Sequence, residues 1–281
     1  MTRRRDPRFS KRQLGRLLRT FREQAGMTQP EVAATMDWSV SKLIRIEKAA
    51  VGISTNDLKA LLAEYGTTDP EVVADLVDVA RESREQPWYA RYDAVTTEPF
   101  RRLLAYEGSA AAIHQFHPLL VPGHLQTPDY ARAVLATVYS GDELDLALEA
   151  RISRQAQLEG PDRPRLVALV DESAVRRAVG GPDVLREQLR YLLDRTLDDL
   201  VTLRVVPLAK GAHPGLAGAF LLIELDEEIA DTVLFEENVG QDYLANGDSD
   251  KVTAAWERFL AIEQVALTEQ QTRTLLESLV A

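Results

Sequence analysis

Apolar residues recur at three- and four-residue spacing through the first 66 residues, which is the pattern of short amphipathic helices. The pattern predicts helices over residues 10–24, 28–37, 39–48 and 55–65. Ser10 with Gln13, and Thr28 with Glu31, have the spacing of capping boxes at the first two helix starts. The second and third helices are short and separated by a tight turn, which is typical of a helix-turn-helix unit. The small Ala33 would let these two helices cross closely.

The rest of the chain alternates helical and strand-like runs. Strands rich in β-branched and aromatic residues are predicted at Arg165–Val170, Val201–Val206, Ala219–Leu225 and Thr232–Phe235. Helices are predicted over residues 100–116, 142–158, 182–198, 248–265 and 268–280. We therefore predict a mainly α N-terminal domain at residues 1–68, a helical connector at 69–95, and an α+β domain at 96–281 with a small four-stranded sheet.

Charge divides the chain in the same place. Residues 1–66 hold 13 Lys and Arg against 7 Asp and Glu, whereas the remainder carries 20 basic and 37 acidic residues. A basic small domain suits a polyanion, and an acidic large domain would be repelled by one. Cysteine is absent, and no apolar run reaches the roughly 18 residues of a membrane span. We expect a cytoplasmic protein, associated with the nucleoid, that does not bind membranes.

The segments from Thr28 to Ala33 and from Ser39 to Glu47 resemble the phage-repressor-like (Xre) helix-turn-helix family. The resemblance implies that Gln29 contacts a DNA phosphate and that Ser39, Val40, Ser41 and Arg45 face base edges in the major groove. Ala49 departs from the family, which commonly has glycine there, so we expect the third helix to end near Gly52. The alternative is a helical unit that binds only protein.

The chemistry of these side chains suits duplex DNA. Arg45 can donate two hydrogen bonds to guanine, and Val40 can contact a thymine methyl. Lys42 and Lys48 are expected to contact phosphates, as are Arg3, Arg4 and Arg5. An acid facing DNA would weaken binding, so Glu47 is expected to pair inside the domain.

The later segment from Val121 to Val134 is similar to a domain of unassigned biochemistry found in actinobacterial helix-turn-helix regulators. His124 departs from that pattern, which usually has an apolar residue there. Such regulators resemble WhiJ-type repressors, and they imply a small acidic BldB-like partner protein encoded nearby in an antitoxin-like pair. The C-terminal domain would bind that partner, a small-molecule ligand, or both, and would carry the contacts of a homodimer. Operator half-sites would then lie about one DNA turn apart.

We find no catalytic motif in the sequence and expect neither enzyme activity nor a cofactor or metal. The glycine-rich loop is the best candidate for a ligand or partner site, through Gly211, His213, Gly215 and Gly218; a simple long turn is the alternative. His114 and His117 are close enough in sequence to share a metal, although ordinary surface or capping histidines are favoured. The rival functional class is an enzyme with a DNA-binding appendage.

Overall fold

The computed structural model describes the chain except residues 1–5, 158, 161–162, 226–231, 237–242 and 247–249. The chain divides into two compact units, Met1–Ala90 and Arg91–Ala281. Arg3, Arg4 and Arg5 lie outside the described residues.

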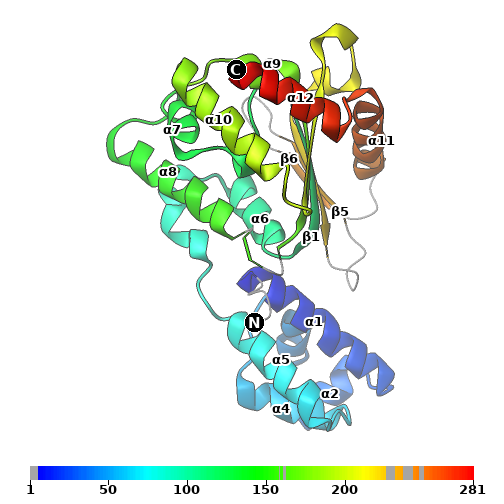
Figure 1. Ribbon diagram of the computed structural model, residues 1–281. Helices are drawn as coiled ribbons and strands as arrows, with labels where there is room; N and C mark the ends of the chain where they lie inside the picture. The colour runs from blue at the N-terminus through cyan, green and yellow to red at the C-terminus, as the bar shows by residue number, and fades with distance from the viewer. Residues whose placement is uncertain (1–5, 158, 161–162, 226–231, 237–242, 247–249) are drawn as a thin grey trace. The chain divides into compact units, whose positions relative to one another are not determined.

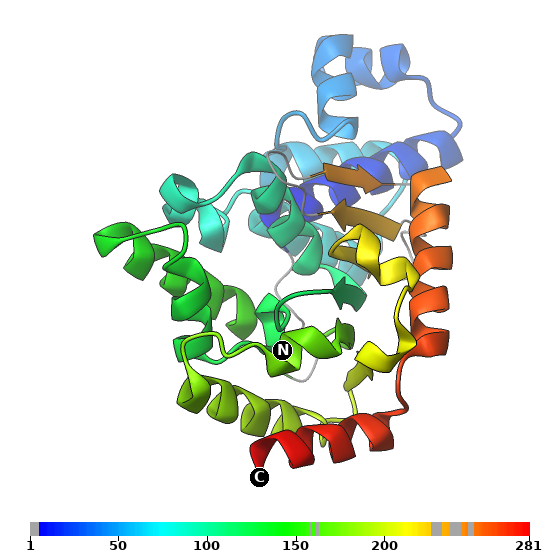
Figure 2. The same cartoon turned by 90° about the horizontal axis from the view of Figure 1, so that it is seen from above.

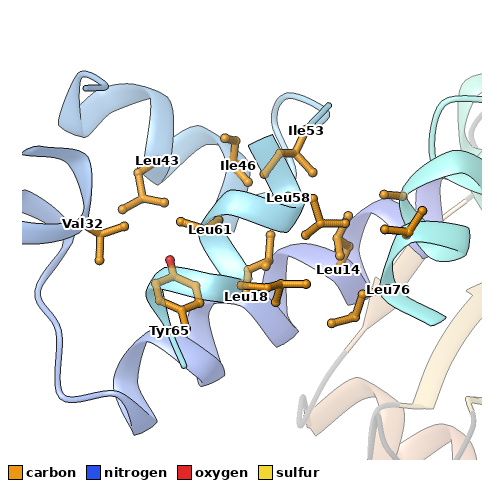
Figure 3. Close-up of a cluster of buried hydrophobic side chains, with 13 residues drawn as sticks. Leu14, Leu18, Val32, Leu43, Ile46, Ile53, Leu58, Leu61, Tyr65 and Leu76 are labelled. Atoms are coloured by element: carbon orange, nitrogen blue, oxygen red, sulfur yellow. The ribbon is translucent and has the colours of Figure 1, made fainter. Parts of the chain in front are cut away.

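The first unit is helical. Its helices are α1 (Pro7–Gln24), α2 (Gln29–Thr35), α3 (Val40–Glu47), α4 (Thr55–Glu64) and α5 (Pro70–Glu82). Buried side chains from all five helices form one core, in which Leu18, Leu43 and Leu58 are fully buried. Figure 3 shows these side chains converging between the helices. Helix α5, which lies in the range predicted as a connector, contributes Leu76, Val77 and Ala80 to this core.

Capping explains where the first helices begin. Helix α1 begins earlier than predicted, because Asp6 caps it by accepting from the Arg8 amide at 2.8 Å and Pro7 occupies the first turn. The capping box at Ser10 and Gln13 was therefore wrong, and the Ser10 hydroxyl is buried 3.3 Å from Glu82 Oε2. The box at Thr28 and Glu31 is confirmed.

The second unit contains a six-stranded mixed sheet instead of the predicted four strands, in the order β3-β2-β1-β4-β5-β6. The strands are β1 (Ala110–His117), β2 (Arg165–Asp171), β3 (Val201–Val206), β4 (Phe220–Leu225), β5 (Thr232–Glu236) and β6 (Tyr243–Asn246). Strands β1, β2 and β3 are parallel, and β4, β5 and β6 continue the sheet antiparallel. Strand β1 lies where a helix over 100–116 was predicted; helix α6 (Glu98–Glu107) ends before it.

Helices cover both faces of this sheet. They are α7 (Pro128–Leu135), α8 (Gly141–Ala156), α9 (Glu172–Arg176), α10 (Pro182–Arg195), α11 (Asp250–Val265) and α12 (Glu269–Val280), with short 3-10 turns η2 (Gly123–Leu125), η3 (Leu208–Lys210) and η4 (Pro214–Ala217). A further 3-10 turn, η1 (Trp88–Val95), contains the boundary between the two units. Figures 1 and 2 show α11 against one face and α7, α8 and α10 on the other. Phe116, Phe220 and Phe259 pack together on the α11 face. Within the described residues no helix has the length and apolar character needed to cross a membrane.

Candidate nucleic-acid interface

The turn between α2 and α3 is held by backbone geometry. Asp37 adopts a left-handed conformation with φ 53°, which Asp tolerates better than most residues. The Trp38 amide then donates to the Ala33 carbonyl at 2.8 Å. Ser39 caps α3, and its hydroxyl accepts from the Lys42 amide at 3.2 Å. Ala33 is buried, as its small size suggested.

Helix α3 has a buried face and a polar exposed face. Leu43 and Ile46 lie in the core of the unit. Ser41, Arg45 and Lys48 follow at i, i+4 and i+7, so they share one exposed face. Val40 is 38% exposed and lies at the start of this helix. Within the described part of the chain, Arg45 and Lys48 form no ion pair, so both cations remain available to an external anion.

Lys42 differs from its helix neighbours. Its ammonium lies 3.2 Å from Asp57 Oδ2 on α4 and 3.8 Å from the centre of the Trp38 ring. These two contacts hold the side chain over the turn and across to α4. A phosphate contact by Lys42 would compete with Asp57 for the same charge.

Glu47 is the centre of a buried polar cluster. The Arg22 Nε donates to Glu47 Oε1 at 2.6 Å, and Gln29 Nε2 donates to Glu47 Oε2 at 2.7 Å. A further Arg22 bond, 2.9 Å long, reaches the Met27 carbonyl. The cluster therefore joins α1, α2 and α3, as expected for a Glu47 that pairs within the domain. Burial, followed by the negative charge of Glu47, raises the pKa of Tyr65.

Two further positions, Ala49 and Gly15, determine where α3 ends and how closely α1 passes it. Ala49 has φ 56° directly after the helix, so the helix ends at Glu47 and does not extend toward Gly52 as predicted. Gly15 lies inside the apolar pattern of α1 and carries no local sequence signal, but an added Cβ would lie 2.7 Å from the Glu47 carbonyl oxygen and 2.9 Å from that of Ile46. Only glycine allows α1 to pass this close to the end of α3.

In the second unit, the glycine-rich loop packs against the sheet. His213 Nε2 lies 3.2 Å from Asp171 Oδ2, and its Nδ1 accepts from the Gly215 amide at 3.2 Å. A Cβ at Gly215 would lie 2.3 Å from the Phe116 ring. His213 and Gly215 are therefore occupied in structural contacts, while Gly211 and Gly218 have φ of 64° and 131° and open space around them. This arrangement favours the alternative of a long, ordered turn.

The segment from Val121 to Val134 contributes His124 to a buried ionic group whose members are far apart in the sequence. Glu107 accepts from Arg154 Nε at 2.8 Å, and His124 Nε2 lies 2.9 Å from the same carboxylate. Burial would raise the pKa of Glu107, but Arg154 and His124 outweigh it and lower this pKa to about 2. Burial, reinforced by Arg154, lowers the pKa of His124. Gln155 Nε2 donates to the Gly123 carbonyl at 2.7 Å and so anchors the segment to α8.

The remaining histidines do not form a metal site. His114 and His117 are three residues apart on β1, so their side chains point to opposite faces of the sheet. His114 contacts Glu224 and the Trp256 ring, whereas His117 Nδ1 accepts from the Leu120 amide at 3.0 Å. Among the described residues, no group of three His, Cys, Asp or Glu side chains is arranged to hold a metal ion.

Comparison with known families defines the class of protein. A helix-turn-helix domain family matches residues 13–76, which contain α2 and α3. The first unit is therefore a helix-turn-helix domain, which indicates a DNA-binding regulator. A second family, described as a domain of unknown function (DUF5753), matches residues 100–278. This match covers more than half of the chain, so the chain belongs to that family. No curated protein and no solved structure matches the chain.

Proposed function

We propose that this protein is a sequence-specific transcriptional repressor that inserts α3 into the major groove of duplex DNA. The exposed face of α3 carries the proposal, because it presents Ser41 and Arg45 outward while Leu43 and Ile46 hold the helix in the core. Val40 and Ser39 lie at the end of α3 that would enter the groove first. Lys48 lies about one turn after Arg45, at the C-terminal end of α3, and suits a phosphate contact.

The geometry refines two of the proposed contacts. Gln29 remains a phosphate contact only if its amide keeps one N–H free, because Glu47 accepts from the same nitrogen. Lys42 is proposed to support the turn through Trp38 and Asp57, with its phosphate contact secondary. Base readout therefore falls mainly on Arg45, which can bond guanine O6 and N7 together.

Selection of bound duplexes from a random pool, followed by gel-shift titration, tests this function. Arg45→Ala should weaken binding to the selected duplex by roughly 5- to 150-fold, because a bidentate guanine contact contributes about 1–3 kcal/mol. Arg19→Ala is the matched control, since Arg19 is exposed on α1 and pairs with Glu23. Equal loss from both variants, or the absence of any selected sequence, would overturn the placement of α3 in the groove.

We further propose that the second domain controls DNA binding in the manner of WhiJ-type regulators, through a small acidic partner protein, a small-molecule ligand, or both, and that it joins two copies into a homodimer. This assignment and the antitoxin-like role rest on the resemblance of the second domain, in which residues 121–134 are one of the matching blocks. The proposed location at the nucleoid follows from the proposed DNA binding. Co-expression with the product of the adjacent small gene, followed by size-exclusion chromatography, tests the partner. Separate elution at micromolar concentrations would contradict it.

A further inference from the structure

The charge of Lys42 is already paired inside the first unit, unlike the charges of Arg45 and Lys48. The Lys42 Nζ lies 3.2 Å from Asp57 Oδ2 and 3.8 Å from the centre of the Trp38 ring. Within the described residues, Arg45 and Lys48 form no ion pair. The ring comes from the turn before α3, and the carboxylate comes from the first turn of α4. Two elements therefore hold one ammonium group in place.

This pair lies at the surface of the domain, where a phosphate can reach it. The Lys42 side chain is 41% exposed and the Asp57 side chain is 37% exposed. Lys42 directly follows Ser41, which is proposed to face the base edges, so it lies on the helix that would enter the groove. A phosphate that approaches Lys42 must displace one carboxylate oxygen, and it is repelled by the charge of that carboxylate. Asp57 thus opposes the phosphate contact that Lys42 would otherwise make.

We propose that Asp57 is a positioning residue for DNA binding, which holds Lys42 away from the phosphate backbone and so lowers the affinity for duplex DNA of any sequence. This inference rests on the proposed function. Phosphate contacts raise affinity without reading the sequence. A cation withheld from the backbone therefore leaves a larger share of the binding to base contacts such as those of Arg45.

Gel-shift titrations of the full chain at two salt concentrations, about 50 and about 200 millimolar, test this role with the selected duplex and an unrelated duplex of equal length. Asp57→Asn removes the charge and keeps the size of the side chain. It should raise the affinity for both duplexes about 3- to 10-fold for each bound copy at the lower salt concentration. The slope of log affinity against log salt should steepen by about 0.9 for each bound copy, which is the effect of one added phosphate contact.

A double-mutant cycle separates an effect through Lys42 from direct repulsion between Asp57 and the DNA. Lys42→Met removes the ammonium group and keeps a long side chain with good helix propensity. In this background, Asp57→Asn should change the affinity by less than about twofold, because no cation remains to be released. An equal gain in both backgrounds would overturn the proposal, because the carboxylate would then act on the DNA directly.

Glu23→Gln is the matched control, since it also removes one acid from an exposed ion pair of the same domain. Arg19 Nε lies 2.8 Å from Glu23 Oε1, and both residues belong to α1. This variant should leave the salt slope unchanged, and Asp57→Glu, which keeps the charge, should bind DNA like the unmodified protein. A gain from Glu23→Gln as large as that from Asp57→Asn would contradict the proposal.

A thermal melt without DNA checks that each variant is folded. If Asp57→Asn unfolds the domain, Asp57→Gln is the second neutral variant, because glutamine at this position has the spacing of a capping box with Ser54. The outcomes keep this inference distinct from the proposed function. If the selected duplex is bound through Arg45 while the folded neutral variant changes neither affinity nor slope, only the role of Asp57 fails. If no duplex is bound by any variant, the proposed function fails and the role of Asp57 fails with it.

Discussion

Ala49 occupies a backbone conformation that normally favours glycine. Its φ of 56° costs an L-residue about 1–2 kcal/mol in the folded state, and a glycine would avoid this cost. Part of the stabilisation is offset, because glycine has more conformational freedom in the unfolded chain. We expect Ala49→Gly to raise the free energy of unfolding of the first domain by about 0.5–1 kcal/mol, measured by urea denaturation. Ala50→Gly should lower it, because Ala50 has no positive φ to relieve. Destabilisation by both changes would contradict the strain at Ala49.

Gly15 provides the opposite test at a single residue. In an exposed helix, Ala is more favourable than Gly by about 1 kcal/mol. At Gly15 the added methyl would meet two backbone oxygens of α3, which cannot rotate away. We expect Gly15→Ala to destabilise the domain by about 1–3 kcal/mol in thermal or urea denaturation. Thr20→Ala, at an exposed position of the same helix, should be neutral or slightly stabilising.

At the scale of whole elements, α1, α2 and α3 depend on one carboxylate. Removing Glu47 leaves the Arg22 guanidinium buried without its main partner. Breaking a buried ion pair on one side costs about 3–5 kcal/mol. Glu47→Ala should therefore unfold a large share of the first domain at 37 °C, as read by circular dichroism. Glu23→Ala removes an exposed acid that also faces Arg22, and it should change stability by less than about 1 kcal/mol.

His117, the last residue of β1, makes the stability of the second domain depend on pH. Burial, with a smaller effect of Arg151, lowers the pKa of His117 to about 4 from 6.5. The unfolded chain then takes up this proton before the folded chain does, so stability is complete above pH 6.5 and falls as the pH decreases toward 4. The loss amounts to about 3 kcal/mol over this range. His117→Asn keeps an acceptor for the Leu120 amide but does not titrate. The difference in free energy of unfolding between the unmodified protein and this variant, measured by chemical denaturation, should therefore shrink as the pH is lowered from 7 to 4.5. An unchanged pH profile in the variant would contradict the role of His117.

Local sequence patterns predicted some elements well and others poorly, for physical reasons. The Thr28–Glu31 capping box and the strands Val201–Val206 and Thr232–Glu236 carry strong local signals, and they form where expected. Strand β1 is central and covered on both sides, so its apolar residues do not alternate and merge with those of α6. Strand β6 is short and gives little signal.

The residues of the candidate sites also differ in how far local sequence patterns predict them. The exposed face of α3 follows from helical periodicity, and Glu47 was expected to pair inside the domain. The partners of Lys42 and His213 lie 15 and 42 residues away, so spacing alone does not predict them.

At the scale of the whole molecule, the proposed homodimer makes a geometric prediction about DNA. Two copies related by a two-fold axis place their α3 helices on one side of the duplex, so the half-sites should be inverted and about 10 base pairs apart. Inserting 5 base pairs between the half-sites turns one of them to the opposite side and should reduce affinity by about 100-fold or more, because one α3 helix then loses its base contacts. Inserting 10 base pairs returns that half-site to the same side of the duplex as the first and should recover part of the affinity.

The gel-shift series should include a duplex with a single half-site as its reference. Equal affinity for all four duplexes would show that one copy binds alone, and it would remove the homodimer while leaving the contacts of Arg45 intact.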